Sequence, residues 1–155
     1  MLAVNLHGPF TTCKAAIAQF ENQEQPGGVI INICSVAAGA GYLGGAAYTA
    51  SKHGLSGLSK NTAFAYADKG IYSIALFPGL MNTNISEPIT KGADEEALQK
   101  FHRKTQVTLA GIDPATNLVP LENVAKYCVF VSLDKSIARN LNGSTATLSN
   151  NWPPS

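Results

Sequence analysis

Tyr48 and Lys52 are the residues whose types and spacing could do chemistry, and Ser35 lies thirteen residues before the tyrosine. On a helix, positions four apart share one face, so the Tyr48 hydroxyl and the Lys52 ammonium can reach one pocket. A free tyrosine, with a pKa of about 10, is a poor acid–base catalyst at neutral pH. A neighbouring cation favours the phenolate and brings a tyrosine toward the range in which proton transfer works well. We therefore expect Tyr48 to exchange a proton with a substrate oxygen that Ser35 holds.

A Tyr–Lys pair at this spacing also occurs by chance on surface helices, so its neighbours in the sequence decide the interpretation. Asn5 precedes the pair, the apolar run 30–34 leads into Ser35, and the segment 78–83 follows. Motifs in this order resemble those of the short-chain dehydrogenases/reductases, and the resemblance extends to about residue 148. Chains of that family open with a glycine-rich TGxxxGxG turn and an Asn-Asn-Ala-Gly segment, which this sequence does not contain. It therefore resembles the C-terminal part of such an enzyme.

The resemblance implies an NAD(P)-dependent oxidoreductase that transfers a hydride between nicotinamide and a secondary alcohol or carbonyl compound. Tyr48 would be the general acid–base, and Ser35 would hold the reacting oxygen. Lys52 would favour the tyrosine phenolate and bind the nicotinamide ribose. Asn5 would distort its helix and hold a water on the proton path from the lysine to bulk solvent. Without the opening strands, the chain by itself would be inactive.

The resemblance also implies which residues bind the nicotinamide end of the cofactor. They are Tyr48, Lys52, Pro78, Gly79, Met81 and Thr83. Three stretches, 27–32, 51–54 and 78–83, are similar to the NAD-linked 15-hydroxyprostaglandin dehydrogenase subgroup. This similarity favours NAD over NADP and an oxidising role on a secondary alcohol, and it leaves the small-molecule substrate open.

A second interpretation keeps the fold without the chemistry: a truncated, non-catalytic dimerisation module. The helices predicted over 2–20 and 45–67 form the dimer interface in the family, and the second of them has a face rich in glycine and alanine. We therefore expect a homo-oligomer built through these helices. A serine hydrolase requires a GxSxG turn, and Ser56 does not have that spacing.

Composition predicts one domain over residues 1–155 and excludes several classes of partner. Only 14% of the residues are charged and the net charge is +1, which is typical of a chain that buries much of its surface. The arginines are Arg103 and Arg139 alone. This balance argues against a nucleic acid or an anionic membrane as the partner.

The three cysteines, at 13, 34 and 128, are far apart and have no metal-ligand spacing, so we expect neither disulfides nor a metal site. No secretory leader is recognisable at the start, and a cytoplasmic location follows as an expectation. Residues 25–51 carry no charge. Because that stretch contains Asn32, Ser35 and several glycines, it predicts a buried strand and a loop instead of a membrane span.

Segments with apolar residues at helical spacing alternate along the chain with short apolar runs typical of buried strands, which predicts an α/β fold. Helices are expected over 2–20, 45–67 and 120–133, and strands over 29–33, 71–77 and 144–149. A further helix over 94–104 would cover the substrate. The strands would be the last three of a Rossmann-like, doubly wound parallel sheet with helices on both faces.

Two glycine patterns need separate interpretation. The sequence Gly39-x-Gly41-x-x-Gly44 matches the dinucleotide fingerprint formally, but a phosphate-binding turn should follow its strand at once. Five residues intervene here, so we assign these glycines to a loop beside the substrate. Many family members follow the last strand with Val-Asp-Gly-Gly, whereas this chain reads Leu-Ser-Asn-Asn over 148–151.

Overall fold

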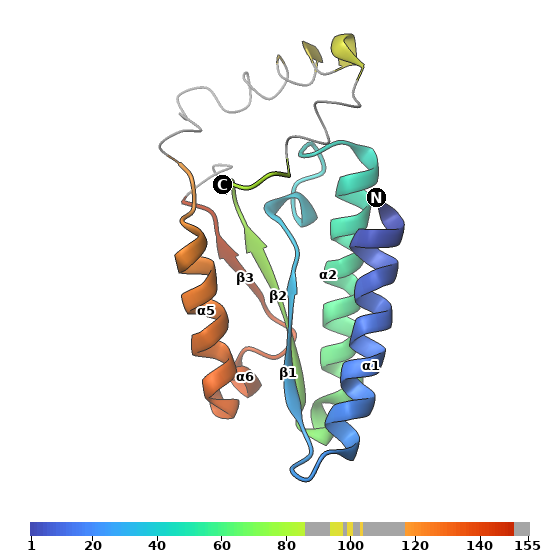
Figure 1. Ribbon diagram of the computed structural model, residues 1–155, viewed down its shortest axis with the longest axis vertical. Helices are drawn as coiled ribbons and strands as arrows, with labels where there is room; N and C mark the ends of the chain where they lie inside the picture. Colours follow the sequence, from blue (N-terminus) through green and yellow to red (C-terminus); the bar gives the residue numbers. More distant parts are fainter. Residues whose placement is uncertain (86–93, 98, 101–102, 104–116, 151–155) are drawn as a thin grey trace.

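A three-stranded parallel sheet forms the centre of the chain (Figure 1). Its strands are β1 (Gly28–Ile33), β2 (Ile71–Pro78) and β3 (Thr145–Leu148), in the order β1-β2-β3. The two longer strands are mainly apolar, and β1 is also rich in β-branched residues, as is typical of strands covered on both faces. The predicted parallel α/β sheet is confirmed.

The computed structural model describes residues 1–85, 94–97, 99–100, 103 and 117–150. Most of the helix predicted over 94–104 lies outside these ranges. The uncharged stretch 25–51 contains β1, a short 3-10 helix and the start of the next long helix. Within the described residues, no helix has the length and apolar character needed to cross a bilayer.

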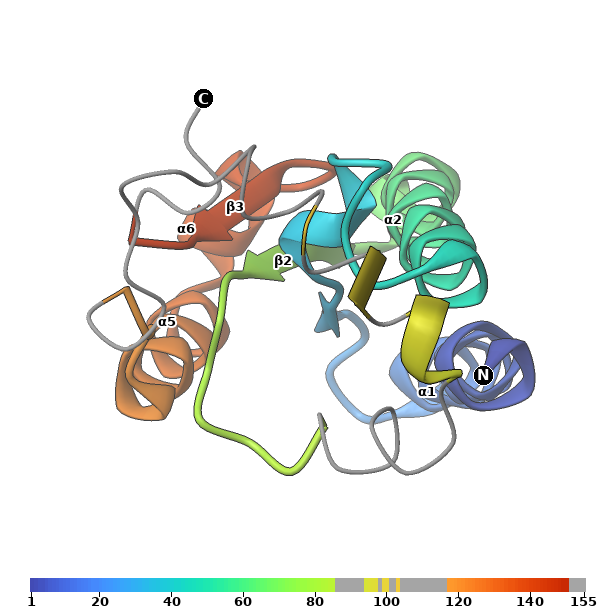
Figure 2. The same ribbon diagram turned by 90° about the horizontal axis from the view of Figure 1, so that it is seen from above.

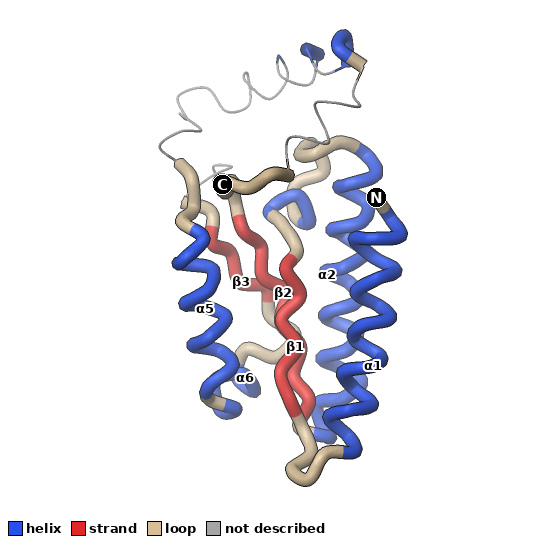
Figure 3. The backbone as a smooth tube through the Cα atoms, viewed as in Figure 1, coloured by secondary structure: helices blue, strands red, loops and turns tan. Residues whose placement is uncertain are grey.

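Helices cover both faces of the sheet (Figures 2 and 3). On one face lie α1 (Gly8–Asn22), preceded by a π-helical turn at Ala3–His7, and α2 (Ala46–Tyr66). On the other face lie α5 (Leu121–Leu133) and α6 (Lys135–Asn140). This two-sided cover is the doubly wound arrangement that the sequence predicted.

Each face of the sheet has its own apolar core. On the α2 side, Leu55 and Phe77 pack with buried residues of the segment after β1. On the other side, Ile74 packs against Val131 of α5 and Ala138 of α6, and all three are fully buried. Full burial of such a side chain is worth about 1.5–3 kcal/mol. The central strand β2 contributes to both cores and therefore fixes the two helical layers relative to each other.

The structure differs from the sequence-based prediction at two places. Phe10 recurs at helical spacing with Leu6 and Cys13 in the sequence, but it is 48% exposed. The π-helical turn before it holds an extra residue and so shifts the helical faces on its two sides. The helix α6 was not predicted, because six residues carry little periodicity; its start is marked by Asp134, whose Oδ1 accepts from the Ser136 N–H (2.7 Å).

The strand β1 has a partner on one side only, within the part of the chain that the structure describes. The Cys34 N–H donates to the Leu76 carbonyl (2.8 Å), so the peptide groups of the preceding residue face the opposite, open side. There the Ile33 carbonyl accepts from the Lys52 ammonium (3.0 Å). One open-edge carbonyl is thus already hydrogen-bonded by the lysine of the candidate catalytic pair.

Candidate active site

Ser35 lies just past the carboxyl end of β1, where parallel α/β sheets place their ligands. It is the N-cap of a short 3-10 helix, Val36–Ala38, and its Oγ accepts from the Ala37 N–H (3.1 Å). This bond fixes the hydroxyl oxygen and leaves its hydrogen available to donate elsewhere. The position expected for Ser35 from the sequence is the one it occupies.

Tyr48 and Lys52 lie one turn apart on α2, as their spacing required. The Lys52 Nζ is 5.7 Å from the centroid of the Tyr48 ring, within the range of a cation–π contact. Lys52 is half-buried, and burial lowers its pKa, while the neighbouring Cys34 sulfur raises it by a smaller amount. The ammonium is therefore held close to the tyrosine in surroundings that are only partly solvated.

Gly44 makes room for the Tyr48 ring. A Cβ on this glycine would overlap the ring, and the backbone φ of +77° is one that side-chain-bearing residues rarely adopt. The Tyr48 ring in turn packs against the buried cluster that follows β1. Gly44 is thus explained by its contact with the Tyr48 ring and not by phosphate binding.

We expect Gly44→Ala to reduce the free energy of unfolding by about 2 kcal/mol, because it combines strain at positive φ with overpacking. Gly41→Ala is the matched control, since nothing lies within 4 Å of its added Cβ and its φ is not positive. Urea denaturation measures both. Equal losses for the two variants would contradict the role given to Gly44.

Asn5 lies within the π-helical turn Ala3–His7, so the distortion that the resemblance implied is present at this asparagine. Its Nδ2 donates to Ser51 Oγ (3.3 Å), and Ser51 Oγ donates to the Tyr48 carbonyl (2.6 Å). Ser51 is fully buried and was not singled out from the sequence. The only available signal was its place between Tyr48 and Lys52 on the same helix.

Gly54 of α2 allows the π-helical turn Ala3–His7 to approach this helix closely. A Cβ at this position would come within 2.9 Å of the Leu6 side chain. Gly54 is therefore explained by a packing contact within the chain. For Gly57 nothing lies within 4 Å of the corresponding Cβ, so its face is open.

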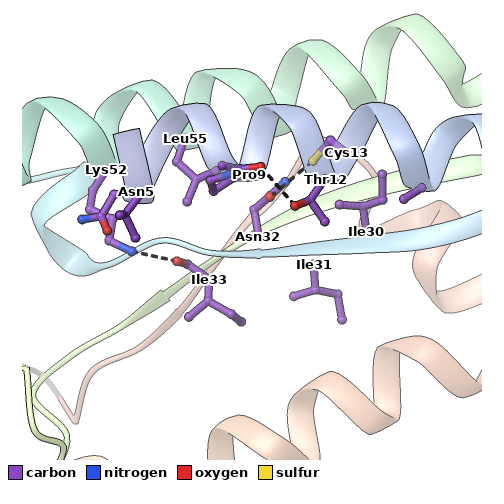
Figure 4. Close-up of a pocket in the computed structure, with 13 residues that line it drawn as sticks. Asn5, Pro9, Thr12, Cys13, Ile30, Ile31, Asn32, Ile33, Lys52 and Leu55 are labelled. Carbon is purple, nitrogen blue, oxygen red and sulfur yellow. Dashed lines mark hydrogen bonds between the residues drawn. The ribbon is translucent and has the colours of Figure 1, made fainter. Parts of the chain in front are cut away.

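A hollow of about 520 Å³ lies between β1 and the start of the first helix (Figure 4). Asn5 and Lys52 line it, together with Thr12, Cys13 and Asn32. Ser35 and Tyr48 are not among the lining residues. The hollow follows the open edge of β1, so it is the space beside the sheet and not a complete substrate pocket.

The segment after β2 contains the other residues implied in cofactor binding. Pro78 is buried at the end of the strand, and Gly79 and Met81 are half-buried. The Gly79 N–H donates to the Leu148 carbonyl (2.8 Å). Thr83 is exposed. The turn lies at the carboxyl end of the sheet, as Ser35 does.

No metal site is found among the described residues, where no three His, Cys, Asp or Glu side chains form a cluster. Cys13, Cys34 and Cys128 are free thiols. Burial raises the pKa of Cys34 to about 11, although the Lys52 charge lowers it in part. That thiol is therefore protonated at neutral pH and is a poor metal ligand.

Comparison with known proteins gives the family. The model of the short chain dehydrogenase family matches residues 1–94. The chain belongs to this family. A short chain dehydrogenase/reductase, dpchG, of Colletotrichum higginsianum is 39% identical over 153 residues, covering 98% of this chain and 54% of that protein. A 3beta-hydroxysteroid dehydrogenase 2 of Eggerthella lenta is 34% identical, with 98% and 54% covered.

Solved structures show the same fold. Levodione reductase matches with a TM-score of 0.71 at 24% identity, covering 97% of this chain and 55% of the other. Acetoin dehydrogenase from Enterobacter cloacae matches with a TM-score of 0.72 at 22% identity, covering 97% and 53%. This short-chain dehydrogenase chain thus spans about half the length of the relatives it matches. The finer similarity to the 15-hydroxyprostaglandin subgroup stays a prediction.

Proposed function

We propose that this chain supplies the catalytic half of an NAD(P)-dependent oxidoreductase acting on a secondary alcohol or carbonyl compound. The observation that carries the proposal is the arrangement at one end of the sheet. A tyrosine and a lysine share one face of α2, and a serine hydroxyl stands at the end of the adjoining strand. Membership of the short-chain dehydrogenase family supports this chemistry.

In the proposed mechanism, the residues of this chain hold the substrate oxygen and move its proton. Ser35 donates a hydrogen bond to the oxygen, and its own oxygen is fixed by the Ala37 N–H. Tyr48 gives a proton to that oxygen in reduction or takes one in oxidation, and the Lys52 ammonium beside its ring stabilises the phenolate. Asn5, anchored to Ser51, supports the proton path from Lys52 to solvent. The nicotinamide supplies the hydride chemistry when bound.

The residues present fit the nicotinamide end of a dinucleotide. Lys52 offers an ammonium with a partly solvated surrounding, suited to ribose hydroxyls. The turn 79–83 offers backbone groups and the Thr83 hydroxyl at the same end of the sheet. NAD is favoured over NADP only by the sequence similarity noted above.

This function is tested by measuring turnover by a complete protein. In that protein, this chain is joined to the part that its relatives have and this chain lacks. Oxidation of a panel of secondary alcohols is followed by the fluorescence of reduced nicotinamide, in the parent and in a variant without the Tyr48 hydroxyl. A protein that self-associates but neither binds cofactor nor turns over substrate supports the alternative, a non-catalytic dimerisation module.

We further propose that the chain self-associates through the outer faces of its first helical segment and α2. Phe10 of α1 is 48% exposed and Phe64 of α2 is 90% exposed, and the outer face of α2 also carries Gly57 with no neighbour. A two-fold contact would cover these apolar positions.

We expect Phe64→Lys to shift the chain from dimer toward monomer in light scattering at micromolar concentration, because two like charges would face each other across the two-fold axis. Leu133→Lys is the matched control: Leu133 is 81% exposed but lies at the end of α5, on the opposite face of the sheet. A parent chain that is monomeric with its fold intact by circular dichroism would contradict the proposal.

A further inference from the structure

Three segments far apart in the sequence meet at the carboxyl end of the sheet (Figure 1). They are 79–81, which follows β2; 117–119, which precedes α5; and 148–150, which follows β3. We call this group the three-segment clasp. It includes the turn that would bind nicotinamide, so its stability bears on the site.

Every pair of segments in the clasp is hydrogen-bonded. The Gly79 N–H donates to the Leu148 carbonyl (2.8 Å), and the Val119 N–H donates to the Leu80 carbonyl (2.7 Å). Both of these bonds join backbone groups. The third pair, 117–119 with 148–150, is joined by side chains: Asn150 Nδ2 donates to the Leu118 carbonyl (3.1 Å). The Asn117 Nδ2 returns a bond to the backbone carbonyl of residue 150 (3.2 Å).

Asn150 has the conformation that this closure needs. Its φ of +49° makes it the one non-glycine residue with positive φ in the described part of the chain. Asparagine tolerates that region better than most residues. Many family members have glycine at this position of the tail, and glycine can adopt the same φ but offers no amide to the Leu118 carbonyl. The side-chain bond is therefore a feature of this chain and not of the pattern it resembles.

The clasp is also tight around Gly79. A Cβ on Gly79 would lie 2.8 Å from the Ser149 Cα, so the tail backbone rests directly on the turn. A shift of the segment 148–150 must therefore move Gly79 or open the Gly79–Leu148 bond. Because Val119 is buried, its contact with Leu80 transmits the same constraint from the other side.

We propose that Asn150 is a positioning residue for the nicotinamide end of the site: its amide closes the three-segment clasp and holds the turn 79–81 in place. The cofactor part of this inference rests on the proposed function. The clasp itself rests on the hydrogen bonds alone.

Two variants of Asn150 test the clasp in the isolated chain by amide hydrogen exchange. Asn150→Gly keeps the backbone conformation and loses the amide, and Asn150→Asp keeps the shape but has no N–H to donate. In both we expect exchange at Val119 and Gly79 to accelerate about tenfold, as the loss of one hydrogen bond predicts. Exchange at Cys34, bonded between β1 and β2, should not change. Asn140→Gly is the control, since Asn140 is exposed at the end of α6, which precedes β3, whereas the clasp follows that strand.

Binding of nicotinamide mononucleotide, followed through the amide resonances of Leu80 and Met81, tests the positioning role. We expect weak binding by the parent, the same binding by Asn140→Gly, and about tenfold weaker binding by both Asn150 variants. Adenosine monophosphate should not bind. Unchanged exchange at Val119 would overturn the clasp. Faster exchange with unchanged nucleotide affinity would overturn the positioning role. A parent chain that does not bind the mononucleotide at all would contradict the proposed function and the cofactor part of the inference, while the exchange rates would still decide the clasp.

Discussion

Tyr48→Phe in the complete protein is expected to abolish turnover while the affinity for cofactor stays nearly unchanged. The substitution removes one hydroxyl from the face of α2 that also carries Lys52 and leaves the ring in its packed position. General acid–base catalysis contributes about 10²–10⁴-fold. Because the hydroxyl acts in the transition state, the loss belongs in kcat and not in cofactor binding.

Tyr66→Phe is the matched control for this experiment. Tyr66 ends the same helix and also has a lysine near its ring, with Lys69 Nζ 5.3 Å from the centroid. It lies at the opposite end of α2, away from Ser35, so we expect full activity. Steady-state kinetics give kcat, and a fluorescence titration gives the cofactor Kd. Turnover by Tyr48→Phe within about tenfold of the parent would exclude Tyr48 as the acid–base.

The isolated 155-residue chain is expected to bind neither NAD nor NADP with micromolar affinity and to show no activity. Pyrophosphate binding needs backbone N–H groups at a glycine-rich turn on a helix N-terminus. In the described residues, the glycine cluster 39–44 follows a 3-10 helix, and Gly44 serves the Tyr48 ring. The residues of this chain that fit the cofactor would contact only its nicotinamide end.

Isothermal calorimetry with NAD and with NADP measures this prediction. The complete protein is the positive control, and we expect it to bind at least one of the two dinucleotides. We propose that this chain contacts only the nicotinamide end of the cofactor. A micromolar Kd for the isolated chain would contradict that proposal, because it would show that the chain also binds the adenosine end.

The sequence predicted best what depends on local patterns. The runs 29–33 and 71–77 became β1 and β2 because nearly continuous apolar segments bounded by glycines have few alternatives in a parallel α/β sheet. The shared face of Tyr48 and Lys52 followed from helical spacing alone, which tertiary contacts could not change. The distortion at Asn5 came from the family resemblance, since nothing in its local composition distinguishes a π-helical turn from an α-helical one.

What depends on contacts between distant segments could not be predicted. The burial of Ser51 follows from the approach of the first helical segment, and no local signal shows that approach. Gly44 was assigned to substrate from its loop context, whereas its neighbour in the structure is a side chain four positions later. The contacts of Asn150 reach residues about thirty positions away in the chain, and only the closed sheet brings them together.

The geometry at the start of the first helix depends on the number of residues in the π-helical turn Ala3–His7. Its closing bond runs from the Gly8 N–H to the Ala3 carbonyl, five positions back, so the turn contains one residue more than an α-helical turn. Deleting a neighbour of Asn5 within this turn would let the helix continue with regular spacing, so the distortion that places the Asn5 side chain would disappear. Asn5 would then lose Ser51. The contact between Asn5 and Ser51 therefore depends on the number of residues in this turn.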